Sequence, residues 1–204
     1  MASRPADHLP RLFLVRHGDT DWTDTRRHTG ATDIVLNVSG EAAARRLGAV
    51  LARESFAAVF SSPLVRARRT AELAGFAGRF EIVPELAEWD YGEYEGRTTA
   101  EIRRECPDWD LFRDGVPGGE SLAQVAARAD RFVGRVRGIE GDVLAFSHGH
   151  TIRVIAARWL GLAPLWGKHF YTATSSVNVL GYEHARDDPV IRLWNSVARP
   201  DGPR

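Results

Sequence analysis

The chain has 204 residues, of which 44% are hydrophobic, so it is long and apolar enough to fold as one domain with a sizeable core. This excludes a disordered or fibrous protein. Its 27 basic residues balance 27 acidic ones, and a net charge of zero argues against a dedicated nucleic-acid or anionic-membrane binder. The single cysteine, Cys106, can form no intramolecular disulfide, which favours a reducing cytoplasm.

The N-terminal part of the chain alternates predicted strands and helices. Residues 1–10 hold two prolines and scattered polar groups, which predicts a flexible leader in front of a domain over residues 11–200. The apolar run 12–15 is too short for a signal peptide or a membrane span and predicts a strand buried on both faces. Three elements are predicted next: a helix capped by Ser39 and broken off near Ser55, a strand at 57–60, and a helix over 63–74 that stops at Gly75.

Residues 85–120 are the least regular part of the chain. They are aromatic, acidic and rich in glycine, which predicts a lid-like insertion of loops around one short helix at 99–106. The following elements are predicted after it: an amphipathic helix over 120–136, a strand at 143–146, a helix at 151–160, and strands around 177–179 and 190–193. Because strands alternate with helices almost throughout, the pattern predicts an α/β fold, a three-layer sandwich with a mostly parallel central sheet and helices on both faces.

Two histidines follow directly on predicted buried strands. Arg16 and His17 come after the first strand, and His148 and Gly149 come after the strand at 143–146. Because the carboxyl ends of parallel strands can converge at one edge of a sheet, these residues could share a crevice. A lone histidine is more often a satisfied core or surface residue, but the paired placement at strand ends favours a functional site.

Two further charged residues stand in unusual surroundings. Arg66 lies near the start of a predicted helix, where the positive end of the helix dipole does not favour an arginine, so it could serve an anion. The alternative is a solvated basic helix face. Glu88 lies among apolar and aromatic neighbours, which favour the protonated form of a carboxyl group and allow it to donate a proton. Alone, it would be an ordinary loop glutamate.

Together these groups suit chemistry on a phosphate monoester. Arginines bind phosphate oxygens bidentately, a neutral imidazole can attack phosphorus, and a protonated carboxyl group can supply the leaving oxygen with its proton. The sequence has no nucleophilic serine elbow, Walker loop or glycine-rich dinucleotide turn. The partner predicted is a small phosphorylated metabolite, with neither a nucleic acid nor a membrane.

Motifs along most of the chain resemble those of the histidine phosphatase superfamily, also called the phosphoglycerate-mutase-like family. Residues 14–20 resemble its signature, residues 27–33 its second phosphate loop, and residues 62–71 its arginine-bearing helix. Glu88 is similar to its proton donor, and Ser147-His148-Gly149 to the motif of its second catalytic histidine. The resemblance implies the phosphoglycerate-mutase-like fold.

The resemblance also implies roles for particular residues. His17 would attack phosphorus and become phosphohistidine, while Glu88 would act first as an acid and then as a base. The transferring group would be bound by Arg16, Arg66 and His148. Further substrate contacts are expected from Thr23, Thr29, Gly30, Tyr91 and Gly149. No metal or other cofactor would be needed, because fixed cations would stabilise the charge. Asp19 stands where the family commonly has glutamate, and it has no predicted role.

Within the family, the sequence favours a phosphatase. Residues 88–96 are similar to the branch of acid and sugar phosphatases, and the chain has no long basic insertion like that of the cofactor-dependent phosphoglycerate mutases. A mutase is the first alternative, and a non-catalytic member that binds a phospho-ligand or a protein is the second. Arg97, Arg103 and Arg104 could reach a second phosphate or cover a solvated helix face. The late strand at 190–194 could pair between the subunits of a homodimer.

Overall fold

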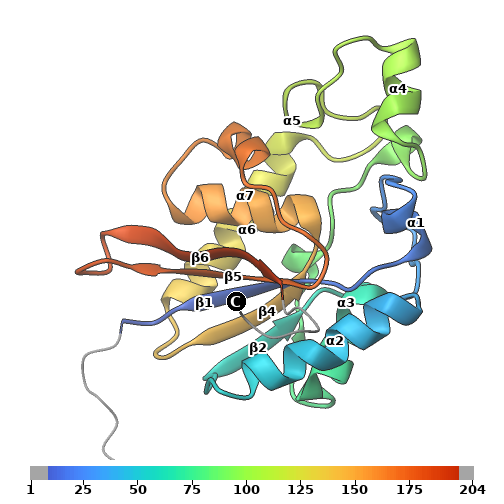
Figure 1. Cartoon of the computed structure of the whole chain (residues 1–204). Coiled ribbons are helices and arrows are strands. Elements are labelled where there is room, and N and C mark those ends of the chain that lie inside the picture. The colour runs from blue at the N-terminus through green and yellow to red at the C-terminus, as the bar shows by residue number, and fades with distance from the viewer. Residues whose placement is uncertain (1–8, 198–204) are drawn as a thin grey trace, which may run out of the picture.

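The computed structural model describes residues 9–197 (Figure 1). The strands are β1 (Leu12–Arg16), β2 (Ala58–Ser61), β3 (Glu81–Ile82), β4 (Val143–Ser147), β5 (Ser176–Tyr182) and β6 (Pro189–Val197). They form one six-stranded sheet in the order β3-β2-β4-β1-β5-β6. The first four strands of this order run parallel, β5 is antiparallel to β1, and β6 is antiparallel to β5. The predicted mostly parallel sheet is confirmed.

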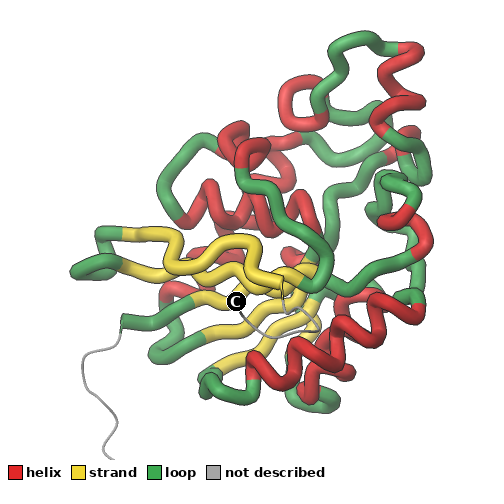
Figure 2. The backbone as a smooth tube through the Cα atoms, in the orientation of Figure 1, coloured by secondary structure: helices red, strands yellow, loops and turns green. Residues whose placement is uncertain are grey.

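Helices cover both faces of the sheet, as Figures 1 and 2 show. The longer ones are α2 (Val38–Leu51), α3 (Val65–Ala71), α6 (Leu122–Arg137) and α7 (Gly149–Trp159). Leu47 of α2 is buried in one core with Phe13, and Phe132 of α6 is buried in the other with Leu14. Phe13 and Leu14 are consecutive residues of β1, so they point to opposite faces of the sheet. The predicted three-layer sandwich is therefore present, with β1 buried on both sides.

The other helical segments are short. They are α1 (Asp21–Asp24), α4 (Thr99–Glu105), α5 (Leu111–Asp114), the π-helical turn η1 (Glu72–Phe76), and the 3-10 turns η2 (Pro84–Leu86), η3 (Gly92–Tyr94) and η4 (Pro164–His169). Between residues 9 and 197, no helix combines the length and the apolar character needed to cross a membrane.

Two predicted helix starts are wrong. Asn37, not Ser39, caps α2, because the Asn37 side chain accepts the Gly40 N–H at 2.9 Å. The Ser39 hydroxyl lies inside the first turn and donates to the same Asn37 oxygen at 2.8 Å. The helix predicted over residues 63–74 begins at Val65 and continues into η1. Gly75 has a φ of 94° there, so it ends the helical run as a glycine stop does.

The segment from Pro84 to Glu120 is more ordered than the predicted loops. It contains α5, η2 and η3 in addition to α4, which matches the short helix predicted at 99–106. Its aromatic side chains belong to the same core as α6 and α7, and they include Trp89, Tyr91, Tyr94, Trp109 and Phe112. Its role as a lid stays a prediction. The predicted leader at 1–10 and the domain end at residue 200 fall mostly outside the described residues.

The sheet topology brings the two histidine motifs together. β1 and β4 are neighbours, with Arg16 paired to Ser147, and the His17 N–H donates to the Ser147 carbonyl at 3.0 Å. His17 and His148 therefore leave the sheet at the same edge, with ring centroids 5.1 Å apart. A β-carbon on Gly18 would lie 2.6 Å from the Gly40 carbonyl oxygen. Glycine is required there because the turn after His17 packs directly on the start of α2.

Candidate active site

A cavity of about 560 Å³ opens where β1 and β4 end. Of the predicted site residues, those that line it are Arg16, His17, Thr23, Thr29, Glu88, Tyr91 and Gly149. Arg66 and His148 are fully buried and lie behind His17. The fold thus brings residues from β1, α7 and the 84–120 segment to one place.

His17 is held in the tautomer that leaves its Nε2 free. Its Nδ1 lies 2.7 Å from the Gly18 carbonyl oxygen, which can only accept, so Nδ1 carries the proton. Nε2 makes no hydrogen bond to a described residue and is open to the cavity. Burial first, and then the charges of Arg66 and Arg16, hold the pKa of His17 well below its usual 6.5. The ring is therefore neutral at pH 7, with its lone pair on Nε2.

Arg16 contributes a cation without a carboxylate partner. Its Nη1 donates to the Thr172 carbonyl at 2.7 Å, whereas its buried Nε has no partner. No carboxylate of residues 9–197 lies within ion-pair distance of Arg16. A buried guanidinium N–H without an acceptor is costly, so an anion in the cavity would stabilise this arrangement.

Arg66 holds the loop that resembles the second phosphate loop. Its terminal nitrogens donate to the carbonyls of Thr29, Gly30 and Thr32 at 2.9 to 3.0 Å. The side chain is fully buried and makes no ion pair with a described carboxylate. Arg66 therefore adds positive potential behind His17 and shapes the wall at the same time.

The Arg66 guanidinium also sets the protonation of His148. Its Nε donates to His148 Nδ1 at 3.2 Å, so His148 carries its proton on Nε2, which donates to the Ser62 hydroxyl oxygen at 2.7 Å. Burial, followed by the charge of Arg66, holds the pKa of His148 well below 6.5. His148 is thus a neutral hydrogen-bond donor, and its contact with a phosphoryl group stays a prediction.

Glu88 lies at the N-terminus of α7 and lines the cavity. Its Oε1 accepts from the N–H groups of Trp89 at 2.9 Å and Thr151 at 3.0 Å, and from the Thr151 hydroxyl at 3.1 Å. Its Oε2 accepts only the His150 N–H, at 3.1 Å. The surroundings are therefore more polar than the neighbouring residues in the sequence indicated, because three of the four donors belong to α7. Oε2 is the oxygen with room for a proton.

The segment before Glu88 is fixed by Arg128, which the motifs did not single out. Arg128 Nη1 donates to the carbonyls of Glu85 at 2.8 Å and Ala87 at 2.7 Å. Its Nε pairs with Glu120 Oε1 at 2.9 Å. Because Arg128 is buried, these bonds position the Glu88 carboxyl group.

One loop residue predicted to contact the substrate does not line the cavity. Thr23 and Thr29 line the cavity, but Gly30 does not. The Gly30 N–H donates to Glu95 Oε1 at 2.8 Å, and its carbonyl accepts from Arg66 at 2.9 Å. Both backbone groups are already bonded, and the Gly30 carbonyl helps to hold Arg66; its contact with a substrate stays a prediction.

Asp19, which had no predicted role, also lines the cavity. Its Oδ1 accepts from the Thr174 hydroxyl, and its backbone carbonyl accepts the Asn37 N–H at 3.0 Å. Asp19 therefore ties the loop after β1 to the segment before β5 and to the start of α2.

The cavity has an outer wall that the motifs did not assign. It consists of Arg26, Arg27, His28, Thr99, His150, Arg153 and Tyr171. Tyr91 connects this outer wall to the site, because its hydroxyl lies 2.5 Å from His150 Nδ1. His28 lies within the motif at residues 27–33 and His150 directly follows the motif at residues 147–149, which was the one signal for them in the sequence. Arg153 and Tyr171 carried no such signal, because α7 and the segment before β5 bring them in.

The histidines of the outer wall are neutral at pH 7. Burial lowers the pKa of His28 to about 4. Burial, followed by the charge of Arg153, holds the pKa of His150 well below 6.5. Burial first, and then the charge of Glu88, raises the pKa of Tyr91 well above 10. The positive charge of the outer wall therefore comes from its arginines.

The burial of neutral His28 predicts acid sensitivity. Its pKa is about 4 in the folded protein, so below pH 6.5 the unfolded chain binds a proton that the folded chain does not. The free energy of unfolding should fall between pH 6.5 and 4, by up to about 1.4 kcal/mol per pH unit for each such histidine. Urea unfolding at pH 7 and pH 5 measures this fall. His28→Gln should reduce it and His184→Gln, at an exposed position, should not; equal falls in both variants would contradict the assignment.

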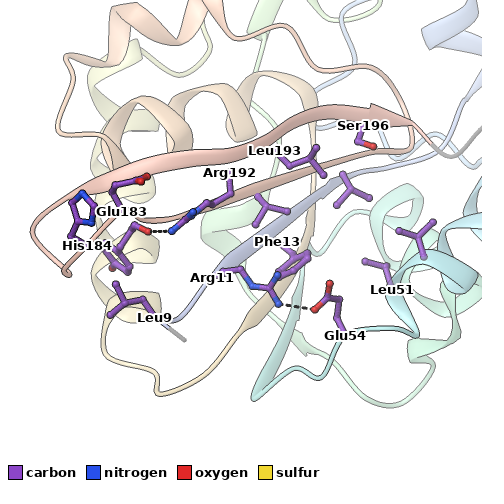
Figure 3. A pocket seen from close by; sticks show the side chains of 14 residues that line it. Leu9, Arg11, Phe13, Leu51, Glu54, Glu183, His184, Arg192, Leu193 and Ser196 are labelled. Carbon is purple, nitrogen blue, oxygen red and sulfur yellow. Dashed lines mark hydrogen bonds and ion pairs between the residues drawn. The ribbon is translucent and has the colours of Figure 1, made fainter. Parts of the chain in front are cut away.

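A second cavity, of about 540 Å³, lies between β1, β5, β6 and α2 (Figure 3). Its two arginines already have hydrogen-bond or ion-pair partners. Arg11 contacts Glu54 and Asp142, each at 2.6 Å, and Arg192 donates to the Tyr182 carbonyl. It contains none of the predicted site residues. The cavity around His17 is therefore the candidate active site.

The sequence matches the model of the histidine phosphatase superfamily (branch 1) over residues 12–197. This range contains the whole sheet and the wall of the His17 cavity. The chain therefore belongs to the histidine phosphatase superfamily, as its motifs predicted.

Known relatives agree with this membership. The chain is 42% identical to an acid phosphatase of Mycobacterium tuberculosis, with 85% of this chain and 87% of the relative aligned. It is 34% identical to sedoheptulose 1,7-bisphosphatase of Saccharomyces cerevisiae, with 90% and 79% aligned. The solved structure of an open reading frame product of Mycobacterium tuberculosis superposes with a TM-score of 0.85 at 38% identity, covering 92% of this chain and 98% of that one.

Proposed function

We propose that this protein is a phosphatase that hydrolyses small phosphate monoesters through a phosphohistidine at His17. The observation that carries the proposal is the neutral His17 ring, whose free Nε2 opens into a cavity beside the unpaired Nε of Arg16. The similarity to an acid phosphatase and to a sugar bisphosphatase supports the same class of reaction.

In the first step, the His17 lone pair forms a bond from Nε2 to phosphorus. The bond from phosphorus to the ester oxygen breaks, and the proton on Glu88 passes to that oxygen, so the leaving group departs as an alcohol. Arg16 and Arg66 stabilise the charge on the transferring phosphoryl oxygens. His17 already carries a proton on Nδ1, shared with Gly18, so the phosphohistidine needs no further proton transfer.

In the second step, water hydrolyses the phosphohistidine. The Glu88 carboxylate takes a proton from water while the water oxygen attacks phosphorus, and the bond from phosphorus to Nε2 breaks. The products are inorganic phosphate and the free enzyme, with Glu88 protonated again. Thr23, Thr29 and Tyr91 line the same cavity and would contact the bound ester.

The proposed reaction needs no metal ion, because guanidinium groups supply the positive charge. Between residues 9 and 197, no three His, Cys, Asp or Glu side chains are grouped to hold one. The cytoplasmic location indicated by the single cysteine stays a prediction. So does a homodimer through β6, whose Leu193 and Val197 side chains are exposed.

A phosphate-release assay tests the proposal. We expect the protein to release phosphate from p-nitrophenyl phosphate and from sugar monophosphates, at a rate that EDTA does not change. Loss of the rate in EDTA, with recovery on adding magnesium, would contradict the metal-free mechanism. With 3-phosphoglycerate we expect phosphate release to exceed formation of 2-phosphoglycerate; fast interconversion with little release would identify a mutase instead.

A further inference from the structure

A third space, a hollow of about 320 Å³, adjoins the active-site cavity. The two share the side chains of His28, Thr99, His150 and Arg153, which line both of them. The two spaces are therefore neighbours, and a ligand bound at His17 would reach the hollow by passing these four residues. The far side of this hollow is built by α4, α5 and η4.

The hollow carries an excess of positive charge. Arg103, Arg153 and Lys168 line it together with a single carboxylate, Asp110. Asp110 caps α5, and its Oδ1 accepts the N–H groups of Phe112 and Arg113 at 3.0 and 3.2 Å. None of the three cations forms an ion pair with a carboxylate of residues 9–197. Unpaired cations gathered around one concave surface attract an anion.

Two of these cations are held in place by backbone groups. Arg153 donates from Nε to the Gly167 carbonyl at 3.0 Å and from Nη2 to the Lys168 carbonyl at 2.5 Å, which leaves its Nη1 free. Arg103 donates only from Nε, to the Trp109 carbonyl at 2.9 Å. Lys168 is the one lysine in the sequence, and its ammonium group bonds to no described residue.

The structure also separates the three arginines that the sequence left open for a second phosphate. Arg97 Nη2 pairs with Glu105 Oε1 at 2.5 Å and lies outside both cavities. Arg104 is exposed and lines neither cavity. Arg103 alone reaches the hollow, because it occupies the face of α4 that turns toward Trp109.

We propose that this hollow binds a second anionic group on the alcohol part of the substrate, so that the preferred substrates are esters with two separated anionic groups, such as sugar bisphosphates. The proposal rests on the proposed phosphatase function, because the first phosphate must occupy the cavity at His17. Arg103, Arg153 and Lys168 are the residues that select the second group. Arg153 also holds η4, so its replacement would mix binding with stability, and the test uses the other two.

Turnover provides the first test. We compare kcat/KM for fructose 1,6-bisphosphate and fructose 6-phosphate, which differ by one phosphate. The bisphosphate has a statistical advantage because either of its phosphates can react. The wild-type ratio of kcat/KM, bisphosphate over monophosphate, should exceed this advantage by about tenfold, the size expected of one charge-assisted contact. Arg103→Gln and Lys168→Gln should each lower the ratio toward that statistical value. Arg104→Gln, the matched control on the same helix, should keep the wild-type ratio.

Binding provides a second test that needs no hydrolysis. Calorimetry on the His17→Ala protein should show fructose 1,6-bisphosphate bound about tenfold more tightly than fructose 6-phosphate, with the preference lost when Arg103→Gln is added and kept with Arg104→Gln. Equal affinities, or equal effects of the two arginine variants, would overturn the second-anion site. Failure of the wild type to hydrolyse any ester, with the binding preference intact, would instead overturn the proposed phosphatase function alone.

Discussion

Replacing His17 with alanine is expected to lower kcat/KM for p-nitrophenyl phosphate by at least about ten-thousandfold, because it removes the nucleophile itself. The other groups would remain, since Arg16 bonds to Thr172 and Arg66 to the loop at 29–32 without help from His17. Steady-state phosphate release at matched protein concentrations measures the loss.

The matched control is His184→Ala, which removes an exposed histidine far from the cavity and should leave the rate unchanged. Rapid quenching with a labelled aryl phosphate adds a direct readout. Wild-type protein should retain an acid-labile phosphoryl group, and the His17→Ala protein should retain none. A variant that keeps a tenth of the wild-type rate and still becomes labelled would show that another residue is the nucleophile.

Replacing Glu88 with glutamine should have an effect that depends on the leaving group. For an alkyl phosphate, whose alkoxide needs a proton, we expect a loss of about a hundredfold to ten-thousandfold in kcat. For p-nitrophenyl phosphate, whose phenolate leaves without one, the loss should be much smaller. The glutamine oxygen can replace Oε1 as acceptor for Trp89 and Thr151, whereas the amide nitrogen cannot accept the His150 N–H as Oε2 does, so three of the four hydrogen bonds should remain.

The control for this variant is Glu93→Gln, an exposed carboxyl group in the same segment that does not line the cavity. The pH profile gives a second readout. We expect an acidic optimum, because the proposed step needs a proton on Glu88 when the leaving oxygen departs, while burial holds the pKa of His17 well below 6.5 and keeps its ring neutral. An equal loss on both esters, or a wild-type rate that is flat from mildly acidic to mildly alkaline pH, would refute the role of Glu88 as an acid.

Several features of the fold could be predicted from local pattern alone. The apolar run of β1 reflects a strand buried on both faces, and the three- and four-residue apolar spacing of α6 reflects one buried face of a helix. The start of α2 could not be predicted in this way. Asn37 and Ser39 are both good N-cap residues. A tertiary contact favours Asn37, because its N–H also donates to the carbonyl of Asp19 in the loop after β1.

The same distinction between local sequence and tertiary contacts applies to the candidate site. The sequence by itself determined the chemistry: a histidine and an arginine after one strand, a histidine after another, and one carboxyl group, because these residue types stand in short motifs. Only the tertiary structure decided the state of each group. The lowered pKa of His17, the α7 donors around Glu88, the bonded backbone of Gly30, and the cations of the adjoining hollow all depend on contacts between residues distant in the chain. Hydrogen bonds and burial are properties of neighbours in space, and residue order does not specify them.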